Sequence, residues 1–429
     1  MRIMVTGASG LIGSAICARL SEEGHEVVAV VRPGSGPVPS GVAAVVPVDV
    51  AQAVGVRVWL PHLRGIQAVV NCVGALQENP REHPERVHAT GVATLFRACE
   101  QRGIRRVIHF SAIGVDREQP SAFSASKLRG DRLLMDRDLD WVILRPSVVL
   151  GRAVFGASAL FRGLSALPLL PQMNQTGPLQ VVTLDDVTAT VAFFVQPSAP
   201  SQMTVELAGP ERLSMSDVVT HYRRWLSWPP AKRFVLPDFL ANLLYRAGDF
   251  AGWLGWRPPV RSTAQKEIRR GAIGDPEPWK EITGIEPSTL SGHLARDPAS
   301  VQERWFAKLF FLKPVIFVVL SLFWLATGII SLTIGYTEGV ELMLRAGTGP
   351  LAGPGVVAGA LADILIGLAI ARRSTSRAGL YGAIALALFY VVAGTILLPE
   401  LWREPLGPLM KIWPILVLHF VGLAILEER

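Results

Sequence analysis

The chain has 429 residues, of which 50% are hydrophobic and 18% are charged, and its mean hydropathy is +0.36. Soluble domains carry about 25% charged residues, so this composition excludes a mainly disordered chain and argues against a wholly soluble protein. The formal net charge of +7 comes from scattered lysines and arginines, which suits positive charge on the cytoplasmic side of a membrane better than a nucleic-acid site.

Residues 2–23 predict a strand, a glycine-rich turn and a helix. The apolar run Arg2–Thr6 leads into TGASGLIG, and an apolar helical pattern then runs from Leu11 to about Glu23. Glycines at this spacing permit a tight turn and a close approach to a pyrophosphate, and the helix N-terminus offers N–H groups to the phosphates. The turn predicts a dinucleotide site whose contacts come from Gly7, Ser9, Gly10, Leu11, Ile12 and Gly13.

The residue after the second predicted strand bears on the choice of cofactor. This strand, Glu26–Val31, ends at Arg32, where an acidic residue would favour NAD(H). A guanidinium instead suits the 2′-phosphate of NADP(H). The alternative is a solvated surface arginine. We expect NADP(H) to be preferred over NAD(H).

The next two predicted strands complete the expected cofactor site. The strand Ala43–Val48 ends at Asp49 and Val50, which we expect to lie beside the adenine ring. The following strand ends in NCVGA, where Val73 and Gly74 would pass close to the adenosine half.

Five segments occur in the order seen in atypical and extended short-chain dehydrogenase/reductases, and on them the chain resembles this family. They are TGASGLIG, NCVGA, VIHFSAIG with Ser111, SASKLRGD with Lys127, and WVILRPSVVLG with Arg145, Pro146 and Ser147. Within the family the chain looks like the branch of the NAD(P)H-binding accessory subunit of respiratory complex I. The resemblance covers about residues 1–300. It implies a Rossmann-type sheet and a cofactor held partly by Lys127 and Pro146.

The resemblance also implies a catalytic Tyr-x-x-x-Lys pair, from which the chain departs. In the family the tyrosine exchanges a proton with the substrate, and the lysine lowers its pKa and holds the ribose. Lys127 and the active-site serine position, Ser111, match, but the tyrosine position is Phe123. Ser124, or a proton of the substrate itself, could substitute. Three interpretations stay open: a reductase with a nonstandard acid, a noncatalytic cofactor-holding module, and a redox-sensing or regulatory binder.

Residues 238–256 predict an amphipathic helix with tryptophans near its end. Leu240, Leu243, Leu244, Ala247 and Phe250 share one helical face. Such a helix lies on the bilayer surface or packs on the sheet as the lid of the substrate region, and both would hold if the substrate enters from the membrane.

Metal and disulfide sites are not expected. The three cysteines, Cys17, Cys72 and Cys99, are widely spaced, and no spacing of His, Cys and Asp resembles a metal site.

Four apolar stretches after about Lys313 approach the roughly 20 residues that cross a bilayer. They are Pro314–Ile334, Leu351–Ala371, Ala378–Leu398 and Leu409–Leu426, and they resemble the DoxX-like four-helix membrane family. Asp363 lies inside the second stretch, so we expect it to face the bundle interior, with His419 as a candidate partner. Its role is either packing or a proton or quinone site.

The loops between these stretches predict the topology. The link Arg372–Arg377 is cationic, whereas the loops around Glu341 and Glu400 carry no positive excess. The positive-inside bias therefore places both termini and the nucleotide domain in the cytoplasm, with the spans in the cytoplasmic membrane.

These expectations together describe a two-part protein. Residues 1–275 form a Rossmann-type doubly wound parallel sheet with a small substrate region from about residue 151. Residues 276–313 form a cytoplasmic connector, and residues 314–429 form an all-α four-helix transmembrane domain. The expected function is a membrane-anchored NAD(P)(H)-binding oxidoreductase that acts on or near a lipophilic partner such as a quinone. The alternative is a noncatalytic NADP(H)-binding assembly, structural or redox-sensing factor of a respiratory complex.

Overall fold

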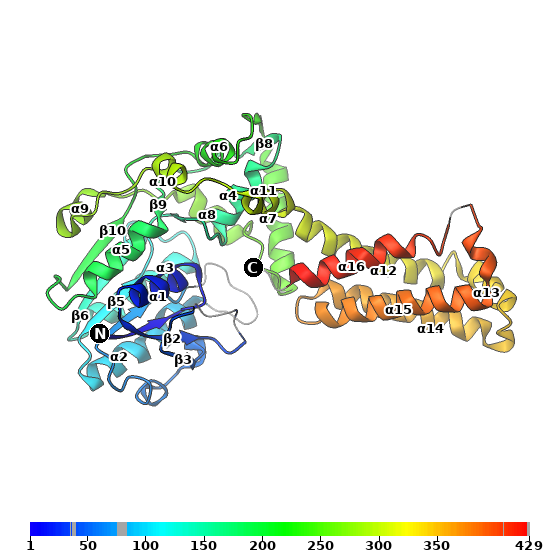
Figure 1. Ribbon diagram of the computed structural model, residues 1–429, viewed down its shortest axis with the longest axis horizontal. Coiled ribbons are helices and arrows are strands. Elements are labelled where there is room, and N and C mark those ends of the chain that lie inside the picture. The colour runs from blue at the N-terminus through cyan, green and yellow to red at the C-terminus, as the bar shows by residue number, and fades with distance from the viewer. Residues whose placement is uncertain (35, 37–39, 75–83, 406, 427–429) are drawn as a thin grey trace. The chain divides into compact units, whose positions relative to one another are not determined.

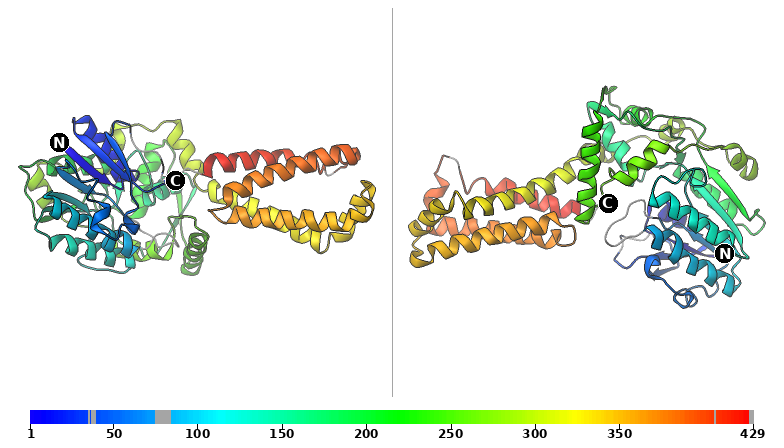
Figure 2. Two further views of the ribbon diagram at one scale, coloured as in Figure 1. Left: turned by 90° about the horizontal axis from the view of Figure 1, so that it is seen from below. Right: turned by 180° about the vertical axis from the view of Figure 1, so that it is seen from behind.

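The computed structural model divides the chain into two compact units. Unit 1 comprises Met1–Phe250 and Pro258–Ala307, and unit 2 comprises Ala251–Arg257 and Lys308–Arg429 (Figures 1 and 2). The structure describes residues 1–34, 36, 40–74, 84–405 and 407–426.

Unit 1 is built on a seven-stranded parallel sheet with the order β10-β6-β5-β4-β1-β2-β3. The strands are β1 (Arg2–Thr6), β2 (Glu26–Val31), β3 (Ala44–Pro47), β4 (Ala68–Asn71), β5 (Arg106–Phe110), β6 (Asp140–Pro146) and β10 (Met203–Leu207). The central strands are almost wholly buried runs of apolar and β-branched residues, as expected when helices cover both faces of a parallel sheet. The predicted Rossmann-type sheet is confirmed.

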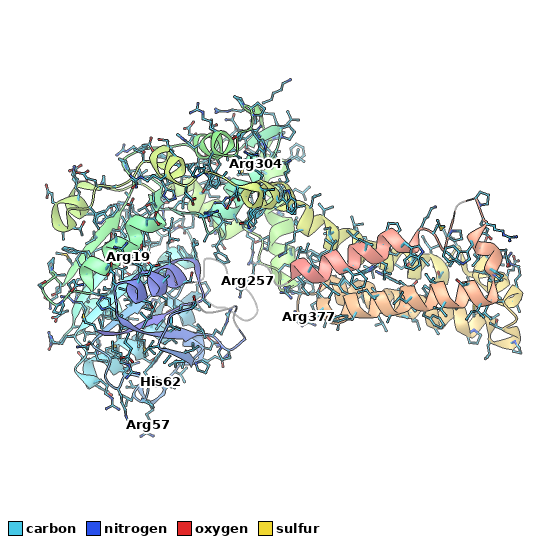
Figure 3. All side chains as sticks on the ribbon, in the orientation of Figure 1. Arg19, Arg57, His62, Arg257, Arg304 and Arg377 are labelled. Carbon is cyan, nitrogen blue, oxygen red and sulfur yellow. The ribbon has the colours of Figure 1, made fainter. Side chains whose placement is uncertain are left out.

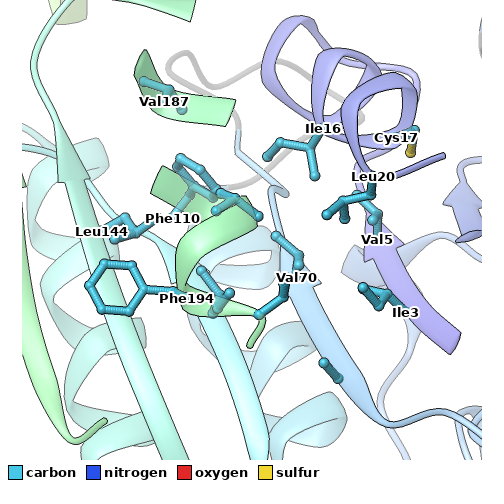
Figure 4. Close-up of a cluster of buried hydrophobic side chains, with 14 of the residues drawn as sticks. Ile3, Val5, Ile16, Cys17, Leu20, Val70, Phe110, Leu144, Val187 and Phe194 are labelled. Atoms are coloured by element: carbon cyan, nitrogen blue, oxygen red, sulfur yellow. The ribbon is translucent and has the colours of Figure 1, made fainter. Parts of the chain in front are cut away.

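Two helical layers enclose this sheet. On one face, α1 (Leu11–Glu22) and α5 (Leu184–Phe194) bury Cys17 and Phe194 against the strands (Figure 4). On the other face, α2 (Gly91–Arg102) buries Cys99 in a second core, to which α3 (Ala122–Met135) contributes Leu134. The same sheet therefore separates two independent apolar cores.

The second half of unit 1 adds a smaller α/β region. It contains the strand pairs β7–β9 and β8–β11 and a core that includes Phe161 and Tyr222. Its elements are β7 (Val149–Leu150), α4 (Ala157–Ser165), β8 (Leu169–Gln172), β9 (Val182–Thr183), α6 (Met215–Trp225), β11 (Lys232–Val235), α7 (Asp238–Trp253), α8 (Ser262–Arg270), α9 (Glu277–Thr283), α10 (Leu290–Arg296) and α11 (Val301–Leu309).

Most of the segment expected to be a connector is part of unit 1. Residues 276–307 lie inside this unit, and Trp279 of α9 is fully buried in the core beneath α5. Its indole N–H donates to Thr190 Oγ1 at 3.0 Å. The composition of the segment did not reveal this buried anchor.

Unit 2 is helical. Its helices are α12 (Leu312–Leu332), α13 (Tyr336–Arg345), α14 (Ala352–Ala371), α15 (Ser376–Leu397) and α16 (Ile412–Leu426). Among the described residues, the stretches Leu312–Leu332, Gly349–Ala371 and Ser376–Leu397 are long and apolar enough to span a membrane. The fourth apolar stretch forms α16, whose 15 residues rise about 22 Å, less than the ~30 Å of a bilayer core.

Small residues let two of these helices approach closely. A Cβ atom added to Gly328 of α12 would lie 2.5 Å from the carbonyl oxygen of Ala360 in α14. In the same seam, Ser321 Oγ donates to the carbonyl of Gly367 at 2.9 Å. Close backbone contact of this kind is how helices associate in lipid.

Basic side chains are spread over both units, as the sequence suggested. Those labelled in Figure 3 include Arg19 in α1 and Arg377 in α15. Arg19 is paired at 2.6 Å with Glu23, the C-cap residue of α1.

Candidate functional site

The residues singled out from the sequence gather at one edge of the sheet. Thr6 at the end of β1 is in register with Val30 of β2 and Asn71 of β4, and Asn71 is in register with His109 of β5. The carboxyl ends of parallel strands thus meet at the edge where ligands of such folds bind.

The glycine-rich turn between β1 and α1 is shaped by contacts that exclude side chains. Gly7 has φ +67°, and a Cβ there would lie 3.0 Å from the backbone of Cys72. A Cβ on Gly13 would lie 2.3 Å from the carbonyl oxygen of Gly7, so the helix packs directly on the turn. Gly10 is the N-cap of α1 and provides no side-chain cap. The first-turn N–H groups are therefore not covered by a capping side chain.

The remaining turn residues are half-buried, in agreement with a surface that a ligand contacts. They are Ser9, Leu11 and Ile12.

The next two strands bring their predicted residues to the same edge. Arg32 directly follows β2 and is half-buried. Asp49 caps a short 3₁₀ turn, η1 (Val50–Gln52): its carboxylate accepts from Ala51 N at 3.0 Å and from Gln52 Nε2 at 3.1 Å. Val50 is buried in the core under α2, so its side chain packs in the protein interior next to this edge of the sheet.

Lys127 is buried between two strand ends. Its ammonium donates to the carbonyl of Val73 at 3.1 Å and to that of Phe110 at 2.8 Å. An ideal Cβ on Gly74 would lie 3.4 Å from Lys127 Nζ, which places the exposed Gly74 backbone beside the ammonium. Burial lowers the pKa of Lys127 to about 8. The geometry brings together three of the predicted cofactor residues, Val73, Gly74 and Lys127.

Phe123 lies one helical turn before Lys127 and contacts a histidine that the sequence analysis missed. The ring of His88 meets that of Phe123 edge-on, with the ring centroids 5.5 Å apart. His88 Nδ1 lies 2.8 Å from Ser126 Oγ, whose hydroxyl also donates to the carbonyl of Phe123 at 2.9 Å. Burial and the nearby Lys127 hold the pKa of His88 well below its usual range, so the imidazole is neutral near pH 7. His88 belongs to a π-helical turn, Arg86–Thr90, which no spacing in the sequence indicates.

Ser111 is placed in a buried polar network. Its hydroxyl donates to Asp131 at 2.9 Å, and the same carboxylate accepts from Arg145 at 3.0 Å. Burial alone would raise the pKa of Asp131, but the polar contacts from His109, Ser111 and Arg145 outweigh it and lower that pKa. This geometry favours a structural role for Ser111, whereas the resemblance implied a catalytic one.

Ser124, the possible substitute for the missing tyrosine, also donates its hydroxyl hydrogen within the protein. It is fully buried, and its hydroxyl donates to Glu267 Oε1 of α8 at 2.9 Å. Ser121, the N-cap of α3, donates to the same oxygen. The two serines thus fix the start of α3 rather than present a proton at the Phe123 position.

Pro146, which the family resemblance assigns to the cofactor site, is the last residue of β6. It is buried, and its carbonyl accepts from Ile113 N at 3.1 Å. The neighbouring Ser147 donates its hydroxyl to the carbonyl of Ala272 at 2.9 Å. This end of the sheet is therefore held to the smaller α/β region.

These features fit a dinucleotide. The positive φ of Gly7 and the close contact of Gly13 leave backbone instead of side chain at the position for a pyrophosphate. Lys127 adds a fixed cation beside that turn.

A surface cavity of about 450 Å³ lies elsewhere. It is bordered by residues 84–86 and by Ala122, Ala125, Ser126 and Arg129 of α3. These α3 positions lie mainly on the helical face opposite Lys127. The cavity therefore lies mainly on the other side of α3 from Lys127. Within the described part of the chain, no three His, Cys, Asp or Glu side chains are grouped as metal ligands would be.

Among the described residues of unit 2, polar side chains of different helices are hydrogen-bonded to each other, but the expected pair of Asp363 and His419 is not among them. Tyr390 of α15 donates to Asp363 of α14 at 3.2 Å, and Thr327 of α12 also hydrogen-bonds this carboxyl group, so Asp363 is paired with these side chains rather than with His419. His419 of α16 instead accepts from Trp324 Nε1 at 2.8 Å, and its Nδ1 lies 2.7 Å from the carbonyl of Ile415. Each pair bridges two helices, as buried polar groups in lipid generally do.

Comparison with known protein families divides the chain in the same way. Residues 7–153 match the NAD(P)H-binding family, and residues 321–420 match the DoxX-like family.

Three curated relatives are similar to parts of the chain. An uncharacterized protein of Mycobacterium tuberculosis is 30% identical over 214 residues, which are 50% of this chain but 22% of that protein. The chain thus spans about a fifth of the length of the mycobacterial proteins it matches. The ceramide reductase of Caulobacter vibrioides is 24% identical over 49% of this chain and 65% of its own length. The mitochondrial 40 kDa subunit of NADH-ubiquinone oxidoreductase of Neurospora crassa is 23% identical over 67% of this chain and 76% of its own.

Solved structures share the fold of unit 1. UDP-glucuronic acid 4-epimerase from Bacillus cereus, in complex with UDP-glucuronic acid and NAD, aligns with a TM-score of 0.53 and 18% identity, covering 72% of this chain and 100% of that enzyme. The Bordetella bronchiseptica enzyme WbmG in complex with NAD aligns with a TM-score of 0.52 and 17% identity, covering 69% and 93%. The chain therefore contains an N-terminal segment similar to the NAD(P)H-binding family and a C-terminal segment similar to the DoxX-like family, and unit 1 shares its fold with NAD-bound enzyme structures.

Proposed function

We propose that this protein is a membrane-anchored NADP(H)-binding oxidoreductase that acts on a lipophilic partner such as a quinone. The observation that carries the proposal is the site formed by Gly7, Gly13 and Lys127 in a chain whose described part also contains three helices long enough to span a bilayer. An anchored enzyme meets partners that are dissolved in the membrane.

The proposed chemistry follows from what the side chains can and cannot do. A bound nicotinamide would supply a hydride at this edge of the sheet. The glycine turn would bind the pyrophosphate, and Lys127, whose ammonium is positioned by the carbonyls of Val73 and Phe110, would hold the ribose. Phe123 has no exchangeable proton, and the hydroxyls of Ser111 and Ser124 donate to carboxylates. A quinone suits this site because its reduced oxygens can take their protons from water.

The second candidate is a noncatalytic NADP(H)-binding factor of a respiratory complex. The same phenylalanine favours it, since Phe123 removes the proton-transferring group of the family while the lysine stays in place. The similarity to the 40 kDa subunit from Neurospora crassa supports this candidate as well.

Cofactor turnover separates the two candidates. The full chain in lipid nanodiscs would be mixed with NADPH and a long-chain quinone, and NADPH oxidation followed by absorbance. The oxidoreductase proposal expects turnover that falls at least tenfold in Lys127→Met and persists in Phe123→Tyr. Tight NADPH binding without any turnover in the wild type would support the noncatalytic factor. NADPH oxidation that is absent in the wild type but appears in Phe123→Tyr would also support the noncatalytic factor.

The proposed preference for NADP(H) rests on Arg32, which follows β2 at the nucleotide edge. If its guanidinium meets a 2′-phosphate, Arg32→Asp should weaken NADPH binding by about 1.5–3 kcal/mol, the range for a hydrogen bond to a charged group. NADH binding should change far less or improve. Calorimetry with both nucleotides measures this, and equal losses for the two would remove the assignment.

A further inference from the structure

Helix α7 carries its large apolar side chains on the face that points away from the protein. Phe239, Leu243 and Phe250 are 70%, 60% and 61% exposed. The opposite face, which packs on the protein, consists of small residues and one tyrosine: Ala241, Tyr245, Gly248 and Gly252. Gly248 is so close to its neighbour that a Cβ would lie 1.7 Å from the carbonyl of Val260. The helix is therefore more apolar on its outer face than on its inner face.

This arrangement disfavours one of the two interpretations made from the sequence. A lid that packs on the sheet would bury its leucines and phenylalanines, whereas α7 buries glycine and alanine. Phe239 and Leu243 on its outer face are largely exposed, so this face suits contact with an apolar phase.

Helix α11 has the same character. Val301, Trp305 and Leu309 recur every four residues and are 59%, 65% and 53% exposed, while Glu303 and Ala307 are buried. Both helices are labelled in Figure 1.

Both helices also run directly into unit 2. The last turn of α7 belongs to unit 2. The residues that follow are hydrogen-bonded within this unit: Trp256 Nε1 donates to the carbonyl of Ala371 at 2.7 Å, and Arg373 N donates to the carbonyl of Leu254 at 3.0 Å. Ala371 and Arg373 border the loop between the spanning helices α14 and α15. Helix α11 leads within three residues into the spanning helix α12. The exposed apolar rows therefore continue the membrane-embedded part of the chain.

We propose that α7 and α11 bind the surface of the bilayer in which unit 2 is embedded, on the side of the α14–α15 loop. The rows of α7 and α11 enter the boundary between headgroups and acyl chains, where Trp305 and Trp253 suit the interface because their rings are amphipathic. Arg246, exposed on the flank of the α7 row, faces the anionic headgroups. The bilayer thus contacts unit 1 itself as well as the spans. This binding does not depend on turnover or on a bound cofactor.

A site-directed label tests this contact in the intact chain. Cys17, Cys72 and Cys99 are replaced by alanine, and a single cysteine is introduced by Leu243→Cys and labelled with an environment-sensitive fluorophore. The matched control is Val54→Cys, because Val54 is an equally apolar residue that is 85% exposed in the loop after η1. Both proteins are placed in nanodiscs of phosphatidylcholine and phosphatidylglycerol. Nitroxide on the acyl chains and iodide in the water then serve as quenchers.

The expected result is a blue-shifted label at position 243 that acyl-chain nitroxide quenches several-fold more than the label at position 54, with the reverse order for iodide. A label at 243 as open to iodide as the control would overturn the proposal. Shielding from both quenchers would overturn it too, because it would indicate a second copy or another protein on α7. If Leu243→Cys does not fold, Phe250→Cys reports the same face and Trp305→Cys reports α11.

Discussion

At the scale of single residues, Lys127 shows how burial acts on one charge. The ammonium is 4% exposed and is held by two backbone carbonyls, and this burial lowers its pKa to about 8. The charged form is therefore present below pH 8 and is lost above it. In the unfolded chain the same amine keeps its proton to about pH 10.5. Between these values the unfolded state binds more protons, so the contribution of Lys127 to stability rises with pH.

We expect nucleotide affinity to follow the opposite course. If the ammonium donates to the ribose, NADPH binding should weaken by roughly tenfold or more as the pH rises from 7 to 9.5, because a charged hydrogen bond worth about 1.5–3 kcal/mol is lost. In Lys127→Met the affinity should be low and flat over this range. Calorimetric titrations at several pH values measure both. A wild-type affinity that does not change with pH would show that the ammonium takes no part in binding.

At the scale of elements, the close packing of α1 on the turn after β1 leaves no room for a side chain at Gly13. A Cβ on Gly13 would lie 2.3 Å from the carbonyl oxygen of Gly7, so Gly13→Ala must push α1 away from the turn. We expect a loss of about 1–3 kcal/mol of stability, as in other overpacked sites, and at least tenfold weaker NADPH binding. Thermal unfolding and calorimetry check the two effects.

The matched control for this change is Gly55→Ala. Gly55 has φ −138° and no atom within 4 Å of an added Cβ, so stability and binding should stay near the wild-type values. Equal effects of the two substitutions would refute the packing argument.

The sequence predicted local elements better than long-range partners. The turn TGASGLIG and strands β1, β2 and β4 were foreseen because apolar runs and glycine spacing are local signals. The partners of Ser111 and Ser124 were not, because Asp131 and Glu267 lie 20 and 143 residues away along the chain. The assignment of His419 to Asp363 was wrong for the same reason.

At the scale of the whole molecule, contacts within unit 2 bring the start and the end of this unit together. Arg373, after α14, donates to the carbonyl of Leu426 at the end of α16 at 2.9 Å. Trp256 packs on Phe317 near the start of α12, with the ring centroids 4.7 Å apart, and donates to Ala371 at the end of α14. The start of the first span, the cationic loop and the end of α16 therefore lie at one end of this unit.

Charge bias predicts that this end faces the cytoplasm. Thiols introduced by Glu341→Cys should then react with an impermeant maleimide from outside intact cells. Thiols introduced by Ser374→Cys should react only after the cells are opened. The reverse pattern would invert the topology and would place the nucleotide domain away from cytosolic NADPH.

Each of the two cores on opposite faces of the sheet contains a buried cysteine whose reactivity can report the opening of that core. Cys17 lies in the core under α1 and Cys99 in the core under α2, both fully buried, and burial raises the pKa of each thiol to about 12. Each thiol therefore reacts only when its own layer opens. The rates of thiol exchange at Cys17 and Cys99 would then time the opening of each layer separately, without unfolding the apolar helices. If bound nucleotide slows exchange more at Cys17 than at Cys99, the ligand stabilises the α1 layer selectively.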